Sequence, residues 1–142
     1  MIVNHELFHT LNQLSRQLTN RMNEELKPFG LYSAQWTVIY VLKTKGSLTQ
    51  KELCQYLSVE APPMTRTIQR LVKQGYVKQV QGEDKREKHI QLTDIALTNY
   101  PQWEQAITHL HQSLLAVLPE PSQQELSKLL NGWFQKLSKT GD

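Results

Sequence analysis

The sequence is poor in cysteine, glycine and charge, and it contains no long apolar run. One cysteine among 142 residues excludes an internal disulfide bond and a zinc site built only of cysteines. No apolar run approaches the roughly 18 residues that span a bilayer. The N-terminus lacks the basic start and the apolar stretch of a signal peptide. We therefore expect a protein of the cytoplasm that has no membrane partner.

Motifs of catalysis are also missing. None of the six glycines belongs to a glycine-rich phosphate loop or to a G-x-S-x-G turn. There is no H-E-x-x-H, and no carboxylates are paired at helical spacing beside a histidine. We therefore predict that the protein is not an enzyme and that it holds no cofactor.

Histidines and the single cysteine are the remaining candidates for a sensor site. His5 and His9 are four residues apart, a workable spacing for a metal on one helical face. His109 and His111 are two apart, which points them to different faces of a helix. Cys54 falls on the inner side of a short helix, where cysteine usually behaves as a small apolar residue. We predict no bound metal, and a sensor of metal or oxidant stays as an alternative.

Charge is low overall but unevenly distributed. The net charge is +3, yet residues 43–88 hold ten Lys and Arg against five Asp and Glu, a balance of +5. The two flanks together carry −2. A basic centre favours an anionic partner such as nucleic acid, although exposed helix faces and loops are often locally basic by chance.

A long amphipathic helix is predicted at the N-terminal end. Apolar residues recur every three or four positions from Val3 to Leu26, and Pro28 and Gly30 end the pattern. About 25 residues of helix are roughly 37 Å long, which is more than one small globule can cover. Such a stripe more often packs against another long helix.

Two more amphipathic helices are predicted at the C-terminal end. The first follows Thr93, which can cap it, and contains Pro101, so it should be kinked or should start near that proline. The second opens with Ser122 and Glu125, an S-x-x-E capping box. Three apolar stripes predict contacts with one another and with a second copy of the chain. The residues expected in this dimer interface are Leu7, Leu11, Leu14, Leu126, Leu130, Trp133 and Phe134.

Shorter helices are predicted in the first half of the middle segment. Residues 33–42 keep the helical spacing of apolar residues, and Gly46 ends that helix. Thr49 and Glu52 form a second capping box, which opens a short helix. Residues 58–60 then make a three-residue turn.

A second short helix and a hairpin complete the middle segment. The helix runs over residues 62–74, with prolines in its first turn, and ends at Gly75. Residues 77–80 and 90–92 alternate in polarity around a charged, glycine-containing segment, which predicts a β-hairpin. Helix, turn, helix and hairpin in this order predict a winged helix-turn-helix, mainly α with a small β-wing.

The second helix of this pair has two different faces. Its inner face is apolar and consists of Met64, Ile68, Leu71 and Val72. Arginine and glutamine on the outer face can bind purine edges bidentately, and the other residue types there suit phosphate oxygens. A solvated helix face is the alternative, which the turn before and the hairpin after disfavour. The predicted recognition residues are Pro62, Pro63, Thr65, Arg66, Gln69, Arg70 and Lys73.

These motifs resemble those of the MarR family of bacterial transcription regulators. The segment that starts at Asp84 matches the family's wing pattern, D-x-R followed after five residues by L-T. The segment that starts at Thr65 matches its recognition pattern, T-R-x-x-x-x-L-x-x-x-G, and Gln35 with Trp36 matches a typical Q-[FW] pair. The resemblance covers residues 31–95 by motif and the rest by helical layout.

The resemblance implies a homodimer that binds double-stranded DNA. Residues 1–30 and 96–142 would be dimerisation helices, and residues 31–95 the DNA-binding domain. Arg86 of the wing would enter the minor groove, whose negative potential attracts it, while Asp84 would hold an arginine or backbone amides and fix the wing. The wing residues are Asp84, Lys85, Arg86 and Lys88, and the residues expected at the DNA backbone are Thr49, Gln50 and Lys51.

Regulation by a small molecule is a further implication of the resemblance. The family's usual effector cleft lies between the arms and the winged domain, where His9, Arg16, Trp36 and Tyr40 could line it, with core packing as an equal alternative for the two aromatic residues. We therefore predict a transcription regulator, a repressor that binds a pseudo-palindromic operator and is relieved by a signal. The alternatives are a winged-helix module for protein contacts and a MarR-type sensor of metal or oxidant.

Overall fold

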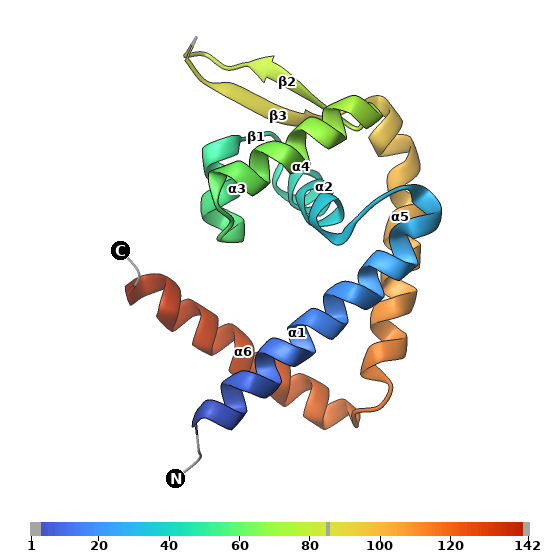
Figure 1. The fold of residues 1–142 in the computed structure, drawn as a ribbon, viewed down its shortest axis with the longest axis vertical. Coiled ribbons are helices and arrows are strands. Elements are labelled where there is room, and N and C mark those ends of the chain that lie inside the picture. The colour runs from blue at the N-terminus through green and yellow to red at the C-terminus, as the bar shows by residue number, and fades with distance from the viewer. Residues whose placement is uncertain (1–3, 85, 141–142) are drawn as a thin grey trace. The chain divides into compact units, whose positions relative to one another are not determined.

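The computed structural model describes residues 4–84 and 86–140, and it is mainly helical with one small antiparallel sheet (Figure 1). The predicted fold class is thereby confirmed. Val3 of the predicted N-terminal stripe and Lys85 of the predicted wing lie outside the described residues. The elements are α1 (Asn4–Leu26), η1 (Lys27–Phe29), α2 (Ser33–Lys45), β1 (Leu48–Thr49), α3 (Gln50–Leu57), α4 (Ala61–Gln74), β2 (Val77–Gln81), β3 (Lys88–Leu92), α5 (Asp94–Leu115) and α6 (Glu120–Thr140).

The chain divides into two compact units, and the division falls within helix α5. The first unit ends at Ile107 and the second begins at Thr108. This division follows packing alone. The functional bounds expected at residues 30 and 95 stay a prediction.

Helix α1 ends where the sequence predicts. Its last residue, Leu26, is fully buried, and the 3-10 turn η1 that follows contains Pro28. Gly30 has a φ of 71° and donates its backbone N–H to the carbonyl of Lys27. This left-handed conformation favours glycine, and it turns the chain from α1 into α2.

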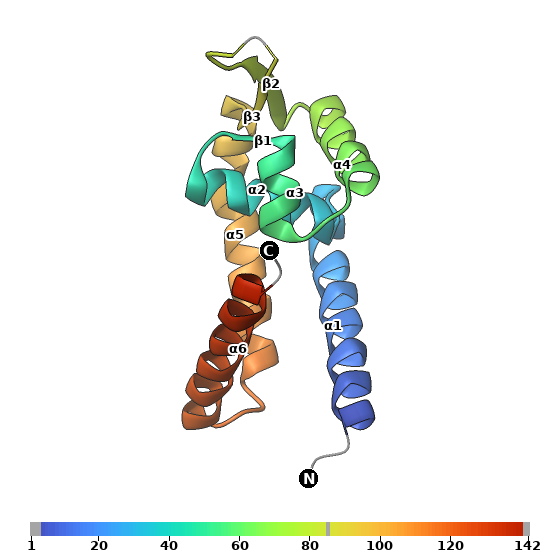
Figure 2. The same cartoon turned by 90° about the vertical axis from the view of Figure 1, so that its left-hand side faces the viewer.

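The helix pair α3–α4 also begins and ends as predicted. Thr49 caps α3, because its Oγ1 accepts from the N–H of Glu52 at 3.1 Å while the carboxylate of Glu52 accepts from the N–H of Thr49 at 3.0 Å. Ser58 has a φ of 55° and ends α3. Figure 2 shows α3 beside α4 in the domain.

The sheet has the strand order β1-β3-β2, and both pairings are antiparallel. Val77 faces Leu92 and Gln81 faces Lys88, so β2 and β3 form the predicted hairpin. Strand β1 was not predicted, since two residues carry no visible alternation. It pairs Thr49 with His89 and so places the start of α3 beside the wing.

A single apolar core lies under α2, α4, the sheet and the first half of α5. Met64, Ile68 and Leu71 of α4 are buried in it as predicted, but Val72 is 45% exposed, so its assignment to the inner face is wrong. Each residue advances a helix by about 100°. Val72 therefore lies beyond the edge of the stripe that Leu71 completes.

Helix α5 starts at its predicted cap, whereas helix α6 starts before its predicted capping box. Thr93 caps α5, since its Oγ1 accepts from the N–H of Ala96 at 3.3 Å, and the helix then runs through Pro101. A helix start near Pro101 is therefore wrong. Helix α6 begins at Glu120, which places Ser122 inside its first turn and not at its cap. Among the described helices, none is long and apolar enough to cross a membrane.

Candidate nucleic-acid interface

The outer face of α4 is exposed over most of its length. Arg66, Gln69, Arg70 and Lys73 are exposed, and Thr65 is half-buried. Because the opposite face is buried in the core, these residues have only one way to point. Pro62 and Pro63 are exposed in the first turn of the helix, where their missing N–H groups cost no helical hydrogen bond.

Two of these side chains also have partners within the domain. The hydroxyl of Thr65 accepts from Nε2 of Gln50 at 2.7 Å and donates to the carbonyl of Ala61 at 2.9 Å. The guanidinium of Arg70 lies 6.0 Å from the ring centroid of Tyr32, within reach of a cation–π contact. Neither contact was predicted, because Gln50 and Tyr32 lie in other helices or loops.

The start of α3 and the wing line one hollow of about 360 Å³. Thr49, Gln50 and Lys51, predicted at the DNA backbone, meet Arg86 and Lys88 of the predicted wing there. Three basic residues and the acidic Glu87 thus line this hollow, a net positive lining that suits an anion. The other lining residues are Gln79 and Ile90. Gln79 was missed, since only its pairing with Ile90 in the sheet places it there.

The turn of the wing is shaped by Asp84. Its Oδ1 accepts from the N–H of Arg86 at 3.0 Å, and its carbonyl accepts from the N–H of Glu87 at 3.0 Å. A backbone amide is one of the two partners that the sequence predicted for Asp84. The carboxylate therefore stabilises the turn that precedes Arg86, which is exposed. Lys85 lies outside the described residues.

The root of the wing contains a histidine that sequence reasoning passed over. His89 lies 3.9 Å from the carboxylate of Glu87. A Cβ added to Gly82 would lie 2.7 Å from the imidazole ring of His89. Only a glycine at position 82 therefore leaves room for this ring. In the capping box, the backbone N–H and then the side chain of Thr49, both hydrogen-bonded to the carboxylate of Glu52, lower the pKa of that carboxyl below the usual 4.5, and His89 adds a smaller effect.

The four residues of the predicted effector cleft lie in different environments. Trp36 is buried and stacks on Tyr100 with ring centroids 5.4 Å apart, and Tyr40 lies 6.1 Å from Trp36. His9 and Arg16 are exposed on α1. The structure thus brings the two aromatic residues together and gives Trp36 a core role. A cleft that joins all four residues stays a prediction.

The hydroxyl of Tyr100 is buried without a hydrogen-bond partner among the described residues. Burial raises the pKa of Tyr100, and the neighbouring carboxylate of Glu104 adds to this shift. Glu104 lies close enough to raise this pKa, but no hydrogen bond of ordinary geometry joins its carboxylate to the hydroxyl. Such a group is a cost to stability.

Residues considered for metal or oxidant sensing are dispersed. Within residues 4–84 and 86–140, no group of three or more His, Cys, Asp or Glu side chains is placed to hold a metal ion. His5, His9, His109 and His111 are exposed on long helices. Cys54 is half-buried and packs against the core.

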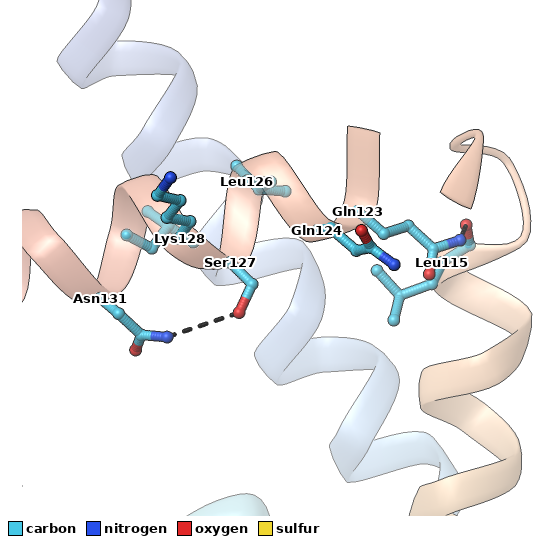
Figure 3. Close-up of a pocket in the computed structure, with 8 residues that line it drawn as sticks. Leu115, Gln123, Gln124, Leu126, Ser127, Lys128 and Asn131 are labelled. Atoms are coloured by element: carbon cyan, nitrogen blue, oxygen red, sulfur yellow. Dashed lines mark hydrogen bonds between the residues drawn. The ribbon is translucent and has the colours of Figure 1, made fainter. Parts of the chain in front are cut away.

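Large apolar side chains are exposed on α1 and α6. Of the residues predicted at a dimer interface, Leu11 and Trp133 are half-buried, and the exposed ones are Leu7, Leu14, Leu126, Leu130 and Phe134. Within the second unit, Leu115, Leu126 and Leu130 help to line a hollow of about 630 Å³ (Figure 3). Leu18, Leu129 and Leu137, which also belong to the predicted apolar stripes, are exposed as well, and so is Phe8, which the sequence reasoning missed.

Comparison with known proteins identifies the family. A MarR family model matches residues 29–87. The HTH-type transcriptional regulator YwoH of Bacillus subtilis (strain 168) is 44% identical over 134 residues, 94% of this chain and 98% of that protein. The multiple antibiotic resistance protein MarR of Escherichia coli (strain K12) is 33% identical over 110 residues, 76% of this chain and 74% of that protein.

A solved structure agrees with these relatives. A mutant of MarR from E. coli complexed with operator DNA has a TM-score of 0.83 to this chain at 28% identity, covering 89% of this chain and 92% of that one. The match to YwoH covers 94% of this chain and so extends beyond the winged domain into the long terminal helices. The chain therefore belongs to the MarR family of helix-turn-helix transcription regulators.

Proposed function

We propose that this protein is a repressor that binds a pseudo-palindromic DNA operator as a homodimer and is relieved by a signal. One observation carries the proposal: the exposed face of α4, the start of α3 and the wing turn are cationic and polar, and they belong to one winged domain. The E. coli MarR mutant that resembles this chain was solved with operator DNA.

The chemistry of the surface supports DNA as the partner. Arg66 and Gln69 on α4 can bind purine edges in a major groove, while Lys51 and Lys88 suit phosphate oxygens. Arg86 follows the turn that Asp84 stabilises, as a side chain inserted into a narrow minor groove would need. A module for protein contacts alone would expose apolar or acidic groups on α4, whereas this helix exposes no acidic residue and, after its first turn, exposes arginine, glutamine and lysine with Val72 as the one apolar residue.

The terminal helices support the dimer. Exposed leucine and phenylalanine side chains on α1 and α6 form apolar faces that water solvates poorly. A second copy of the chain offers the same faces, and a twofold pair would present two copies of α4. Half-sites would then lie about one helical turn apart, roughly 10 base pairs. Since the target would be bacterial chromosomal DNA, we place the protein in the cytoplasm.

Repression would be relieved by an effector that binds in the predicted cleft. Trp36 and Tyr40 are in contact, and Tyr100 beside them has a buried hydroxyl with no hydrogen-bond partner in the described chain. An aromatic effector with a polar group would suit this aromatic surface. His9 and Arg16 would contribute from α1.

Selection of bound fragments from genomic and random DNA tests the function. The purified chain should enrich a pseudo-palindromic sequence, and its affinity should fall steeply with salt because phosphate contacts release counterions. Repeating the selection with small aromatic acids tests relief. Enrichment of no sequence, with full folding verified by circular dichroism, would refute the proposal.

A further inference from the structure

Two side-chain amides tie the end of helix α4 to the segment that joins α1 and α2. Nε2 of Gln74, the last residue of α4, donates to the carbonyl of Gly30 at 2.8 Å. Oε1 of Gln74 accepts from Nε2 of Gln35 at 2.7 Å. Oε1 of Gln35 in turn accepts from the backbone N–H of Tyr32 at 2.8 Å. The chain of hydrogen bonds starts and ends on the backbone of residues 30–32.

The two backbone groups at the ends of this chain of hydrogen bonds determine how both side-chain amides are oriented. The N–H of Tyr32 can only donate, so Gln35 must present its oxygen there and its nitrogen to Gln74. The carbonyl of Gly30 can only accept, so Gln74 must present its nitrogen there and its oxygen to Gln35. If either amide were flipped, a donor would face a donor or an acceptor would face an acceptor, and hydrogen bonds would be lost. The network therefore has one arrangement.

Burial makes this arrangement costly to break. Gln35 is 3% exposed and, apart from the aromatic residues, is the only buried side chain with polar atoms among the residues that the structure describes. An amide in that position loses its contact with water, so its hydrogen bonds must come from the protein. Gln74 supplies one of them from a helix 39 residues further along the chain.

A second contact joins the same two parts one turn earlier on α4. Arg70 is four residues before Gln74, on the same side of the helix, and its guanidinium lies 6.0 Å from the ring centroid of Tyr32. On the other side of the joining segment, Oδ1 of Asn23 in α1 accepts from the N–H of Ser33 at 2.7 Å. Named contacts thus lead from the last turns of α1 to α4.

We propose that Gln74 and Gln35 are positioning residues that fix the orientation of α4 relative to α1. The apolar contacts of α4 with the core are not directional, and so they tolerate small rotations of the helix. The hydrogen bonds of the amide pair are directional and oppose such rotations. This role depends on the proposed function: if α1 contributes to a twofold dimer, the orientation of α4 on α1 sets the spacing of the two recognition helices.

Spacing between operator half-sites is therefore the property to measure. One extra base pair shifts a half-site by about 3.4 Å and turns it by about 34°. Fluorescence anisotropy should compare the selected operator with versions lengthened or shortened by one base pair between the half-sites. Wild-type protein is expected to lose affinity about tenfold for each change, because its recognition helices are held at one spacing.

The variant Gln74→Ala should bind all three operators within about threefold of one another, since its α4 lacks the directional restraint. Gln74 is exposed, so its truncation leaves no cavity in the core, although the buried amide of Gln35 loses one partner. Gln74→Glu should also bind the three operators with similar affinities, as Gln74→Ala does, because a carboxylate cannot donate to the carbonyl of Gly30. Gln102→Ala, which changes an exposed glutamine of α5, is the control and should discriminate as the wild type does.

Three results would overturn the inference. Equal discrimination by Gln74→Ala and wild type would show that core packing alone positions α4. An equal loss of affinity on all three operators would show a merely structural role for Gln74. In both cases wild-type binding to the operator leaves the proposed function standing. A wild-type protein that binds no operator would overturn the proposed function and the positioning role together.

Discussion

Two side chains of the proposed DNA-binding surface make hydrogen bonds within the domain. Gln50 of α3 donates to the hydroxyl of Thr65 on α4, and Asp84 accepts from the backbone of Arg86. Such contacts reduce the conformational freedom that a side chain would lose on binding DNA. These parts of the proposed surface are therefore ordered in the free protein.

Replacing Arg86 by alanine should weaken binding to the operator. Loss of one phosphate or groove contact also lowers the slope of log affinity against log salt concentration by about one. Gel shifts at several salt concentrations measure both effects. Arg21→Ala removes an exposed arginine from α1 and serves as the matched control. Equal slopes for Arg86→Ala and wild type would contradict the wing assignment.

Replacing Tyr100 by phenylalanine should stabilise the fold. The change removes a buried hydroxyl that has no hydrogen-bond partner in the described chain and keeps the ring that stacks on Trp36. Relief of this unpaired group is expected to raise the free energy of unfolding by about 1 kcal/mol. Chemical denaturation measures the change. Tyr56→Phe, at a 52% exposed position, should have no effect, and a destabilised Tyr100→Phe would refute the prediction.

Local signals were sufficient for most of the helices and strands. The capping box of α3, the glycine that ends α4 and the prolines in its first turn each act within a few residues, and the structure contains all of them. Strand β1 and the start of α6 were not predicted correctly. A two-residue strand exists only through its pairing with β3, and Ser122 offered a capping pattern that the helix does not use.

The capping box predicts a pH dependence of stability. Hydrogen bonds with Thr49 lower the pKa of Glu52 below 4.5, so the ionised carboxylate is favoured in the folded state. Its contribution is complete above pH 4.5 and is lost as the pH falls through the lowered pKa. Glu52→Gln does not titrate. The difference in melting temperature between wild type and Glu52→Gln should therefore change as the solution is acidified from neutral pH, and a constant difference would contradict this origin.

At the scale of the molecule, charge and apolar surface are separated along the chain. The balance of +5 lies in residues 43–88, which contain the winged domain's exposed cations, while the flanks carry −2 and the apolar faces of α1 and α6. Twofold pairing would cover the apolar faces and present about +10 over two neighbouring grooves. Long-range attraction to DNA follows from that arrangement and weakens with salt.

Sedimentation at micromolar concentration should show a dimer. Phe134→Glu should shift the protein to monomer, because a carboxylate buried in an apolar interface would lose its hydration. Phe134 is 58% exposed, so the variant chain can still fold. Gln135→Glu adds the same charge at the neighbouring exposed position and should remain dimeric. A stable wild-type monomer would refute the dimer.

The linear sequence was sufficient for the order of elements, the direction in which α4 faces and the wing turn, since caps, glycines and apolar periodicity act over a few residues. Val72 shows the limit of periodicity, because the edge of a buried stripe depends on what packs against it. Contacts between distant residues were decided only by the tertiary structure. Gln74 meets Gln35 across 39 residues, and Thr49 meets the wing through β1, because each hydrogen bond needs a partner that folding brings into place.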